Sequence, residues 1–379
     1  MRRARGLLDW KAILGLVLGV GLLLYALRDV DAAHVWAGIR EADPVLLLAG
    51  VTAVTLMYVV RAVRWQPLIE PVRADTAFRA RFAATTIGFG ANNLLPARLG
   101  ELARAYALAR LESVPVAASI GSLVVERLLD GLTVVAFLLA AMAAPDFPEV
   151  GEVGGRDLSG LALLLLVGFT VVGLGLLTLV LWSRHARAVY DATLGRLLPR
   201  ALRRPVREGL RTLIDGFEPL RSPALLGRAV LWSIAVWLVG GVGFWLAFVA
   251  FGIDVPFSGA LFLQSLIALA VALPSAPGFF GLYEAGTRIG LVGVWGVSVN
   301  DAMSFAIGFH IATFVPVTVI GLYYAWRLGI SWREVERGEE MAERAAEAEE
   351  VAAADGSLRT DADAGLDGGS RRRVGGAGP

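Results

Sequence analysis

The chain has 379 residues, of which 56% are hydrophobic and 18% are charged, and its mean hydropathy is +0.64. A soluble domain contains about 25% charged residues, so this composition excludes an ordinary soluble enzyme and a disordered or fibrous chain. Cysteine is absent, which excludes disulfides, thiolate metal sites and cysteine nucleophiles. The composition therefore predicts an all-α, polytopic integral membrane protein.

Apolar runs long enough to cross about 30 Å of hydrocarbon predict six membrane spans. In chain order they lie at residues 10–27, 44–60, 114–144, 161–182, 229–251 and 302–326. Two shorter stretches, 82–95 and 258–273, end at Pro96 and Pro274, and their length is typical of re-entrant or half-membrane helices. If 258–273 and 280–299 each cross fully instead, the protein has eight spans, and hydropathy leaves this choice open.

Arginine is unevenly distributed among the segments between these spans. Residues 61–81 contain five arginines and residues 183–228 contain ten, whereas residues 252–257 contain none. Because arginine-rich loops stay on the cytoplasmic side, we predict a multi-pass cell-membrane protein with both termini in the cytoplasm. The leucines among the arginines of 183–228 also favour amphipathic helices on an anionic membrane surface.

The composition changes abruptly after the last predicted span. Residues 334–367 contain twelve acidic residues against three arginines. We therefore expect a polytopic membrane domain over residues 1–330 and an acidic, disordered cytoplasmic tail over residues 331–379. This tail is too short for a soluble catalytic domain.

Charged residues inside apolar segments cost about 2.5–3.5 kcal/mol each on insertion scales, so they are candidates for function. The first group of polar residues begins at Asn92 and Asn93, where two amides followed by a proline interrupt a helix. The next helix carries Arg98, Glu101 and Arg104 on one face, because these residues lie three apart.

The second group lies inside the predicted span 114–144. Glu126, Arg127 and Asp130 fall on one helical stripe. Two interpretations stay open for them: structural pairing among the three, or a place along the path of a substrate.

The third group interrupts the apolar region after residue 272. Its candidate residues are Pro274, Gly278, Glu284 and Arg288, of which the last two lie one helical turn apart. In the last span, we interpret His310 as a hydrogen-bonded core residue rather than a proton relay.

The first and third groups both contain Leu-Pro, then glycine, then glutamate at the start of a new helix. Paired broken segments in corresponding places of two halves are typical of a transporter site at a repeat interface. Half-helix N-termini there can present N–H groups to a phosphate. The charge partners would be Arg98, Arg104, Arg127 or Arg288. The alternative is a kinked helix pair packed through small residues.

Three runs, at residues 88–101, 126–130 and 274–284, resemble the signatures of a known family over about residues 10–330. It is the lysylphosphatidylglycerol synthase transmembrane-region family, also called flippase-like or UPF0104 proteins. The resemblance implies a helical bundle with re-entrant segments that moves an aminoacylated or otherwise modified phospholipid between leaflets. By motif position, its polar core comprises Arg98, Glu101, Glu126, Arg127, Asp130 and Glu284.

Bifunctional members of that family carry a soluble aminoacyl-transferase domain, and other relatives are fused to glycosyltransferases. The sequence leaves no room for either domain, so we do not expect synthase activity. We expect a phospholipid translocase with a central polar cleft built from the two broken segments. The membrane phospholipid is its substrate, and a separate lipid-modifying transferase is a candidate partner.

No nucleotide-binding loop, dinucleotide fingerprint or metal-ligand spacing occurs in the sequence, so we expect no cofactor, no metal and no nucleic-acid partner. Two alternatives stay open. One is an intramembrane headgroup or glycosyl transferase that uses Glu101, Glu126 and Asp130 as acid or base. The other is a non-catalytic partner of an envelope-lipid enzyme. The oligomeric state is also open.

Overall fold

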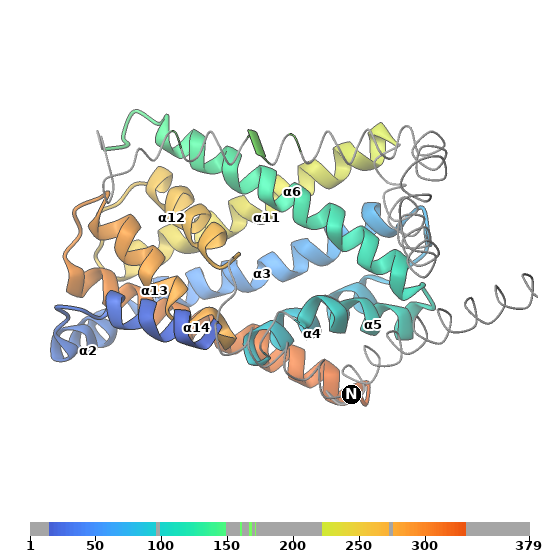
Figure 1. Ribbon diagram of the computed structural model, residues 1–379, viewed down its shortest axis with the longest axis horizontal. Helices are drawn as coiled ribbons and strands as arrows, with labels where there is room; N and C mark the ends of the chain where they lie inside the picture. The colour runs from blue at the N-terminus through green and yellow to red at the C-terminus, as the bar shows by residue number, and fades with distance from the viewer. Residues whose placement is uncertain are drawn as a thin grey trace, which may run out of the picture.

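The computed structural model describes residues 15–95, 99–148, 222–272 and 276–330, together with Gly160, Val167, Gly168 and Val171. All regular secondary structure within these ranges is helical (Figure 1), which confirms the predicted all-α fold. The predicted span 161–182, most of the segment 183–228 and the tail 331–379 lie outside the described residues, as do Arg98 and Pro274.

Within the part of the chain that the structure describes, three long helices are apolar enough to cross a membrane. They are α3 (Pro44–Ile69), α11 (Pro223–Ala250) and α14 (Val299–Arg327). Helix α6 (Val116–Met142) has 27 residues, a length of about 40 Å at 1.5 Å per residue, so it also reaches across hydrocarbon. The first predicted span is described in part as helix Gly15–Ala26, and the short helix α2 (Ala32–Glu41) follows it.

Helix α3 is longer than the predicted span, which ended at residue 60. It continues to Ile69 and carries Arg61 and Arg64 inside the bundle, where both are buried. The sequence-based assignment of these two arginines to a cytoplasmic loop is therefore wrong. A helix continues through them because their charges are paired with carboxylates on a neighbouring helix.

The first broken segment forms a re-entrant hairpin. Helix α4 (Phe78–Leu94) enters the bundle, and α5 (Gly100–Glu112) returns beside it. The Ala77 N–H before α4 donates to the Glu112 carboxylate at 3.1 Å, so the hairpin begins and ends on one side. We call this side, where α3 also ends, the Glu112 end.

The second broken segment is re-entrant too, and it enters from the opposite side. It comprises α12 (Phe257–Ala270), the short helices η3 (Pro277–Phe279) and α13 (Leu282–Thr287), and η4 (Arg288–Val292). The Trp295 ring after η4 lies 5.5 Å from the Phe147 ring, and Phe147 also contacts Phe262 of α12. The segment thus returns to the side where α3 begins, which we call the Asp43 end. The alternative of two full crossings does not occur.

The described helices form two units with the same element order and opposite direction (Figure 1). Each unit has a long helix, a re-entrant hairpin and a second long helix: α3, α4–α5 and α6 in one, α11, α12–α13 and α14 in the other. The two first helices pack antiparallel, since the Asp43 N–H donates to the Ala250 carbonyl at 2.9 Å. Gly50 and Gly243 let their backbones approach closely. Inverted repeats of this kind are a feature of transporter folds.

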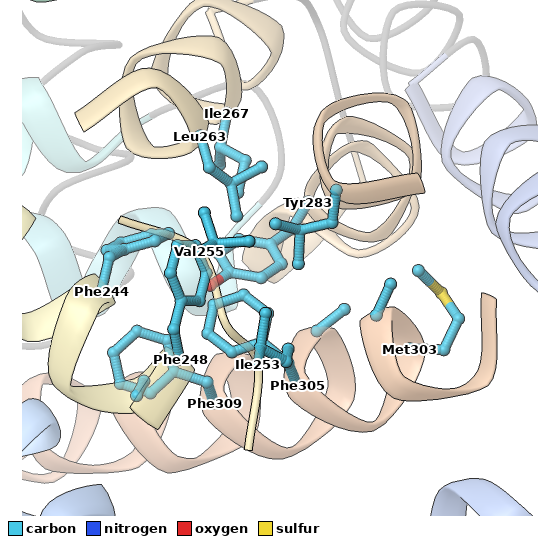
Figure 2. Close-up of a cluster of buried hydrophobic side chains, with 14 of the residues drawn as sticks. Phe244, Phe248, Ile253, Val255, Leu263, Ile267, Tyr283, Met303, Phe305 and Phe309 are labelled. Carbon is cyan, nitrogen blue, oxygen red and sulfur yellow. The ribbon is translucent and has the colours of Figure 1, made fainter. Parts of the chain in front are cut away.

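The two largest packed cores of the described residues flank the middle of the bundle. The core towards the Asp43 end contains a cluster of aromatic rings, in which Phe244, Phe248 and Phe309 surround Phe305 (Figure 2). The core towards the Glu112 end contains Trp65. Close van der Waals packing of this kind holds helices together where no hydrophobic driving force acts between them. The tips of the two hairpins lie between these cores, where α4 contacts η3.

Candidate functional site

A cavity of about 500 Å³ lies between the hairpin tips. It is lined by α3, by both hairpins, and by α6, α11 and α14. Its polar and ionisable lining residues are Tyr58, Arg61, Asn92, Asn93, Glu101, Arg127, Asp130, Trp237, Tyr283, His310 and Thr313. The remaining lining is mainly apolar, with residues such as Phe89, Ile267 and Phe314. A cavity that combines apolar walls with polar groups converging on one space is typical of small-molecule binding.

One wall is a network of ion pairs between α3, α5 and α6. Asp130 accepts from Arg61 at 2.9 Å and from Arg64 at 2.5 Å, and the Trp237 indole N–H donates to it at 3.0 Å. Glu126 accepts from Arg64 at 3.0 Å. Positions 61 and 64 lie on one face of α3, as do 126 and 130 on α6, so helical spacing aligns the two pairs.

Glu126 is the buried centre of this network. Its two carboxylate oxygens accept from Arg104 of α5 at 2.6 and 3.0 Å, a bidentate pair whose fork geometry fixes both side chains. The Arg104 guanidinium also lies 4.0 Å from the centroid of the Trp65 ring. Neither Glu126 nor Arg104 lines the cavity. The expectation that Arg104 meets a phosphate is therefore not supported, because its charge is already satisfied by Glu126.

Arg127 is the most exposed cation of the network, with 41% of its side chain accessible. It binds Glu101 at 2.9 Å and lies 3.6 Å from Asp130. With Arg61, it faces the cavity. Among the residues that the structure describes, the network joins four arginines to three carboxylates, so these seven side chains carry one positive charge in excess. Such a wall attracts an anion, and guanidinium groups are well matched to phosphate.

The second hairpin and α14 supply another wall. His310 Nδ1 lies 2.8 Å from Glu284 Oε1, and His310 Nε2 lies 3.0 Å from the Gly278 carbonyl oxygen. The Tyr283 ring stacks on the imidazole, with centroids 4.1 Å apart. The structure thus agrees with a hydrogen-bonded His310, and it also places this histidine at the cavity.

The structure brings five of the predicted site residues to the cavity: Asn92, Asn93, Glu101, Arg127 and Asp130. Gly278 and Glu284 lie next to it, through His310. Arg288, a candidate partner of the phosphate, does not line the cavity. It donates instead to the carbonyls of Ala26 and Arg28, because it closes the C-terminal end of the first described helix.

Neither half-helix start offers its first N–H to a ligand, contrary to the prediction from helix dipoles. The Gly100 N–H of α5 donates to Asn92 at 2.9 Å. The Gly281 N–H before α13 donates to Glu284 at 2.6 Å. Side chains of the same hairpins therefore cap both positions, and the arginine side chains supply the positive charge of the cavity.

Sequence reasoning missed Arg61 and Arg64, which complete the network. Their signal was present: Arg61, Arg64 and Trp65 repeat at three and four residues, which is one helix face. Sequence reasoning also missed three aromatic residues that line the cavity, Tyr58, Trp237 and Tyr283. An aromatic residue within an apolar run carries no sequence signal that it will line a cavity.

Known proteins are similar in sequence to this chain over about four fifths of its length. A glycosyltransferase, AglD from Haloferax volcanii, is 26% identical over 330 residues, which cover 82% of this chain and 53% of that protein. The chain thus spans about half the length of this relative. A UPF0104 membrane protein from Methanothermobacter thermautotrophicus is 27% identical over 314 residues, covering 81% of this chain and 91% of that protein. A second one from the same organism is 23% identical over 325 residues, covering 82% of this chain and 94% of its own length.

The family described as the lysylphosphatidylglycerol synthase TM region matches residues 12–321, which include both hairpins and the ion network. This match confirms the resemblance that the three motifs indicated. The chain belongs to the lysylphosphatidylglycerol synthase TM-region family of membrane proteins.

Proposed function

We propose that this protein translocates a phospholipid, aminoacylated or otherwise modified, between the leaflets of the cytoplasmic membrane. The observation that carries the proposal is the excess positive charge of the ion network, with Arg61 and Arg127 facing a cavity between two oppositely directed hairpins. A phosphate in the cavity would neutralise that charge. The apolar remainder of the wall would contact the glycerol and the first carbons of the acyl chains.

Two inverted units around one site also fit alternating exposure. A cavity enclosed by hairpins from opposite sides opens to either side when one hairpin moves relative to the other. Guanidinium groups already held by Asp130 and Glu101 need little rearrangement to receive a phosphate, which lowers the cost of binding. Transport would then follow a lipid gradient, as in a scramblase, or an ion gradient.

The charges at the two ends support a cytoplasmic Glu112 end. The connection after α3 contains Arg73, and Arg228 and Arg327 lie at the ends of the helices that meet there. The described residues of the Asp43 end are rich in acids: Asp29, Asp31, Glu41, Asp43, Asp146, Asp254 and Asp301. By the positive-inside rule, both chain termini then lie in the cytoplasm.

The proposal predicts protein-dependent leaflet exchange of lipids that carry a phosphate. Purified protein would be reconstituted with fluorescent phosphatidylglycerol, and the label in the outer leaflet would be bleached with an impermeant reductant. We expect the reductant to bleach more than half of the fluorescence in proteoliposomes, because label from the inner leaflet reaches the outer one. In empty vesicles it should bleach only the half in the outer leaflet. A fluorescent glucosyl-diacylglycerol, which lacks phosphate, is the matched lipid control. Exchange of neither lipid by folded protein would contradict the proposal.

A second candidate function is a lipid headgroup or glycosyl transferase, and the glycosyltransferase relative favours it. Among the three carboxylates suggested as acid or base, Glu101 is the most accessible, with 33% of its side chain exposed. Glu126 and Asp130 are held by arginines. A covalent lipid product from purified protein and an activated donor, lost in Glu101→Gln, would establish this function.

A further inference from the structure

The Glu284–His310 contact requires a proton between the two side chains. A carbonyl oxygen only accepts, so His310 Nε2 carries hydrogen and donates to Gly278. At 2.8 Å from a carboxyl oxygen, Nδ1 either donates as part of an imidazolium or accepts from a protonated Glu284. Both states contain one shared proton and have no net charge. Loss of this proton leaves a carboxylate facing an imidazole lone pair.

The same contact holds the tip of the second hairpin to α14. Glu284 also accepts from the Gly281 N–H, and His310 also binds the Gly278 carbonyl, so both partners fix the tip backbone. The tip contains one strained residue, Phe279, whose φ is 62°, between Gly278 and Gly281, whose φ angles of 69° and 91° glycine adopts without strain. A non-glycine residue in this region needs support from its surroundings. Deprotonation removes one of these supports, because repulsion between the Glu284 carboxylate and Nδ1 replaces their hydrogen bond, while the bond from Nε2 to the Gly278 carbonyl remains.

Other charged groups of the cavity decide how the proton responds to a ligand. Asn92 and Asn93 of α4 and Trp237 of α11 do not titrate. The titratable or charged residues that line the cavity with His310 are Tyr58, Arg61, Glu101, Arg127, Asp130 and Tyr283. The network that contains the arginines has one positive charge in excess. A bound phosphate anion and the loss of the shared proton each add one negative charge beside this excess, so either event alone neutralises it.

We propose that Glu284 and His310 form a proton site that controls the second hairpin, so that the protein carries a proton and a lipid phosphate in the same direction. This inference rests on the proposed function for its transport step but not for its proton step. The cavity has no excess charge when phosphate and proton are both bound or both absent, so these two states cost less to enclose in the apolar bundle than a state with only one of them bound. On release, the proton leaves Nδ1 or the carboxyl group for water, and the tip opens because it has lost the Glu284–His310 bond to α14.

A pH gradient across wild-type proteoliposomes tests the coupling. We expect fluorescent phosphatidylglycerol to accumulate in the leaflet on the alkaline side and to redistribute when an ionophore collapses the gradient. Equal distribution despite the gradient, with exchange still protein-dependent, would overturn the proton coupling and leave the proposed function intact. Absence of exchange would instead contradict the proposed function.

Glu284→Gln tests the site itself. Its amide NH₂ donates to Nδ1 and its carbonyl accepts from the Gly281 N–H, so it imitates the protonated glutamate permanently. We expect this variant to fold and its exchange rate to fall to about one tenth of the wild-type rate or lower, because the hydrogen bond that must break during transport is always made. The response of exchange to the pH gradient should be lost. His34→Gln is the matched control, because His34 makes a similar contact with Asp301, at 3.1 Å, but on the exposed surface. Identical behaviour of Glu284→Gln and wild type would contradict the assignment.

Nuclear magnetic resonance reads the proton site without any transport. The chain has three histidines, His34, His185 and His310, so replacing the first two by glutamine leaves one imidazole signal. We expect this signal to change with the protonation of the pair when Glu284 is present and to stay that of neutral, Nε2-protonated imidazole in Glu284→Gln. A signal that is independent of pH in both proteins would overturn the proton site.

Discussion

Glu126→Gln is expected to destabilise the protein more than any other single charge change in the ion network. The substitution removes the negative charge that Arg64 and Arg104 share, and both arginines are fully buried. Breaking a buried pair by removing one partner costs about 3–5 kcal/mol. The charge excess of the network also doubles. We expect a large fall in the melting temperature of the detergent-solubilised protein, measured by the exposure of buried tryptophan.

Glu70→Gln is the control for this experiment. Glu70 also pairs with an arginine, Arg228, at 3.0 Å, but 32% and 50% of the two side chains are exposed. A surface pair of this kind contributes about 0–1 kcal/mol, so the melting temperature should change little. Equal effects of the two substitutions would show that the network does not stabilise the bundle.

Arg127→Gln is expected to slow phosphatidylglycerol exchange by about tenfold to a hundredfold. A charge-assisted hydrogen bond to a phosphate is worth about 1.5–3 kcal/mol, and Arg127 is the most exposed cation facing the cavity. Glu101, its partner, is itself one-third exposed and stays solvated after the change. The protein should therefore keep its melting temperature. The measurement is the bleaching rate in proteoliposomes, at equal amounts of folded protein.

Arg228→Gln is a closely matched control, because Arg228 has similar exposure and a carboxylate partner at a similar distance, 3.0 Å against 2.9 Å. It lies at the Glu112 end and not at the cavity. We expect wild-type exchange from it. If both substitutions slow exchange equally, the effect comes from the overall surface charge of the protein, and the role of Arg127 in the cavity is contradicted.

Much of the architecture was predictable because it depends on local patterns. The lengths of the apolar runs predicted α11 and α14 to within a few residues, and the shorter runs before Pro96 and Pro274 predicted the two hairpins. The choice between a hairpin and two crossings was not local. It depends on contacts such as Phe147 with Trp295, which lie far apart in sequence.

The candidate site was predictable in part for the same reason. The stripe of Glu126, Arg127 and Asp130 follows from helical spacing alone. The place of Arg61 and Arg64 in the bundle does not, because hydropathy treats a charge as the end of a span. The carboxylates on α6 offset the free-energy cost of burying these two arginines. A single sequence does not show which residues of another helix will pair with them. The role of His310 likewise depends on Gly278 and Glu284 from another element.

Ligand protection of a single cysteine tests the central claim, that a lipid phosphate enters the cavity between the hairpins. Because the chain has no native cysteine, Thr313→Cys, which lines the cavity, would be its only thiol. Asp75→Cys and Glu41→Cys, at exposed positions of the Glu112 and Asp43 ends, are the controls. The rate of reaction with a charged methanethiosulfonate would be measured in detergent, with short-chain phosphatidylglycerol or glucosyl-diacylglycerol added.

We predict that phosphatidylglycerol slows the labelling of Cys at position 313, that glucosyl-diacylglycerol does not, and that neither lipid changes the controls. Adding Arg127→Gln should abolish the protection, because the phosphate then loses its most accessible guanidinium. Labelling at position 313 that is as fast with phosphatidylglycerol as without it would contradict the assignment of this cavity as the lipid site.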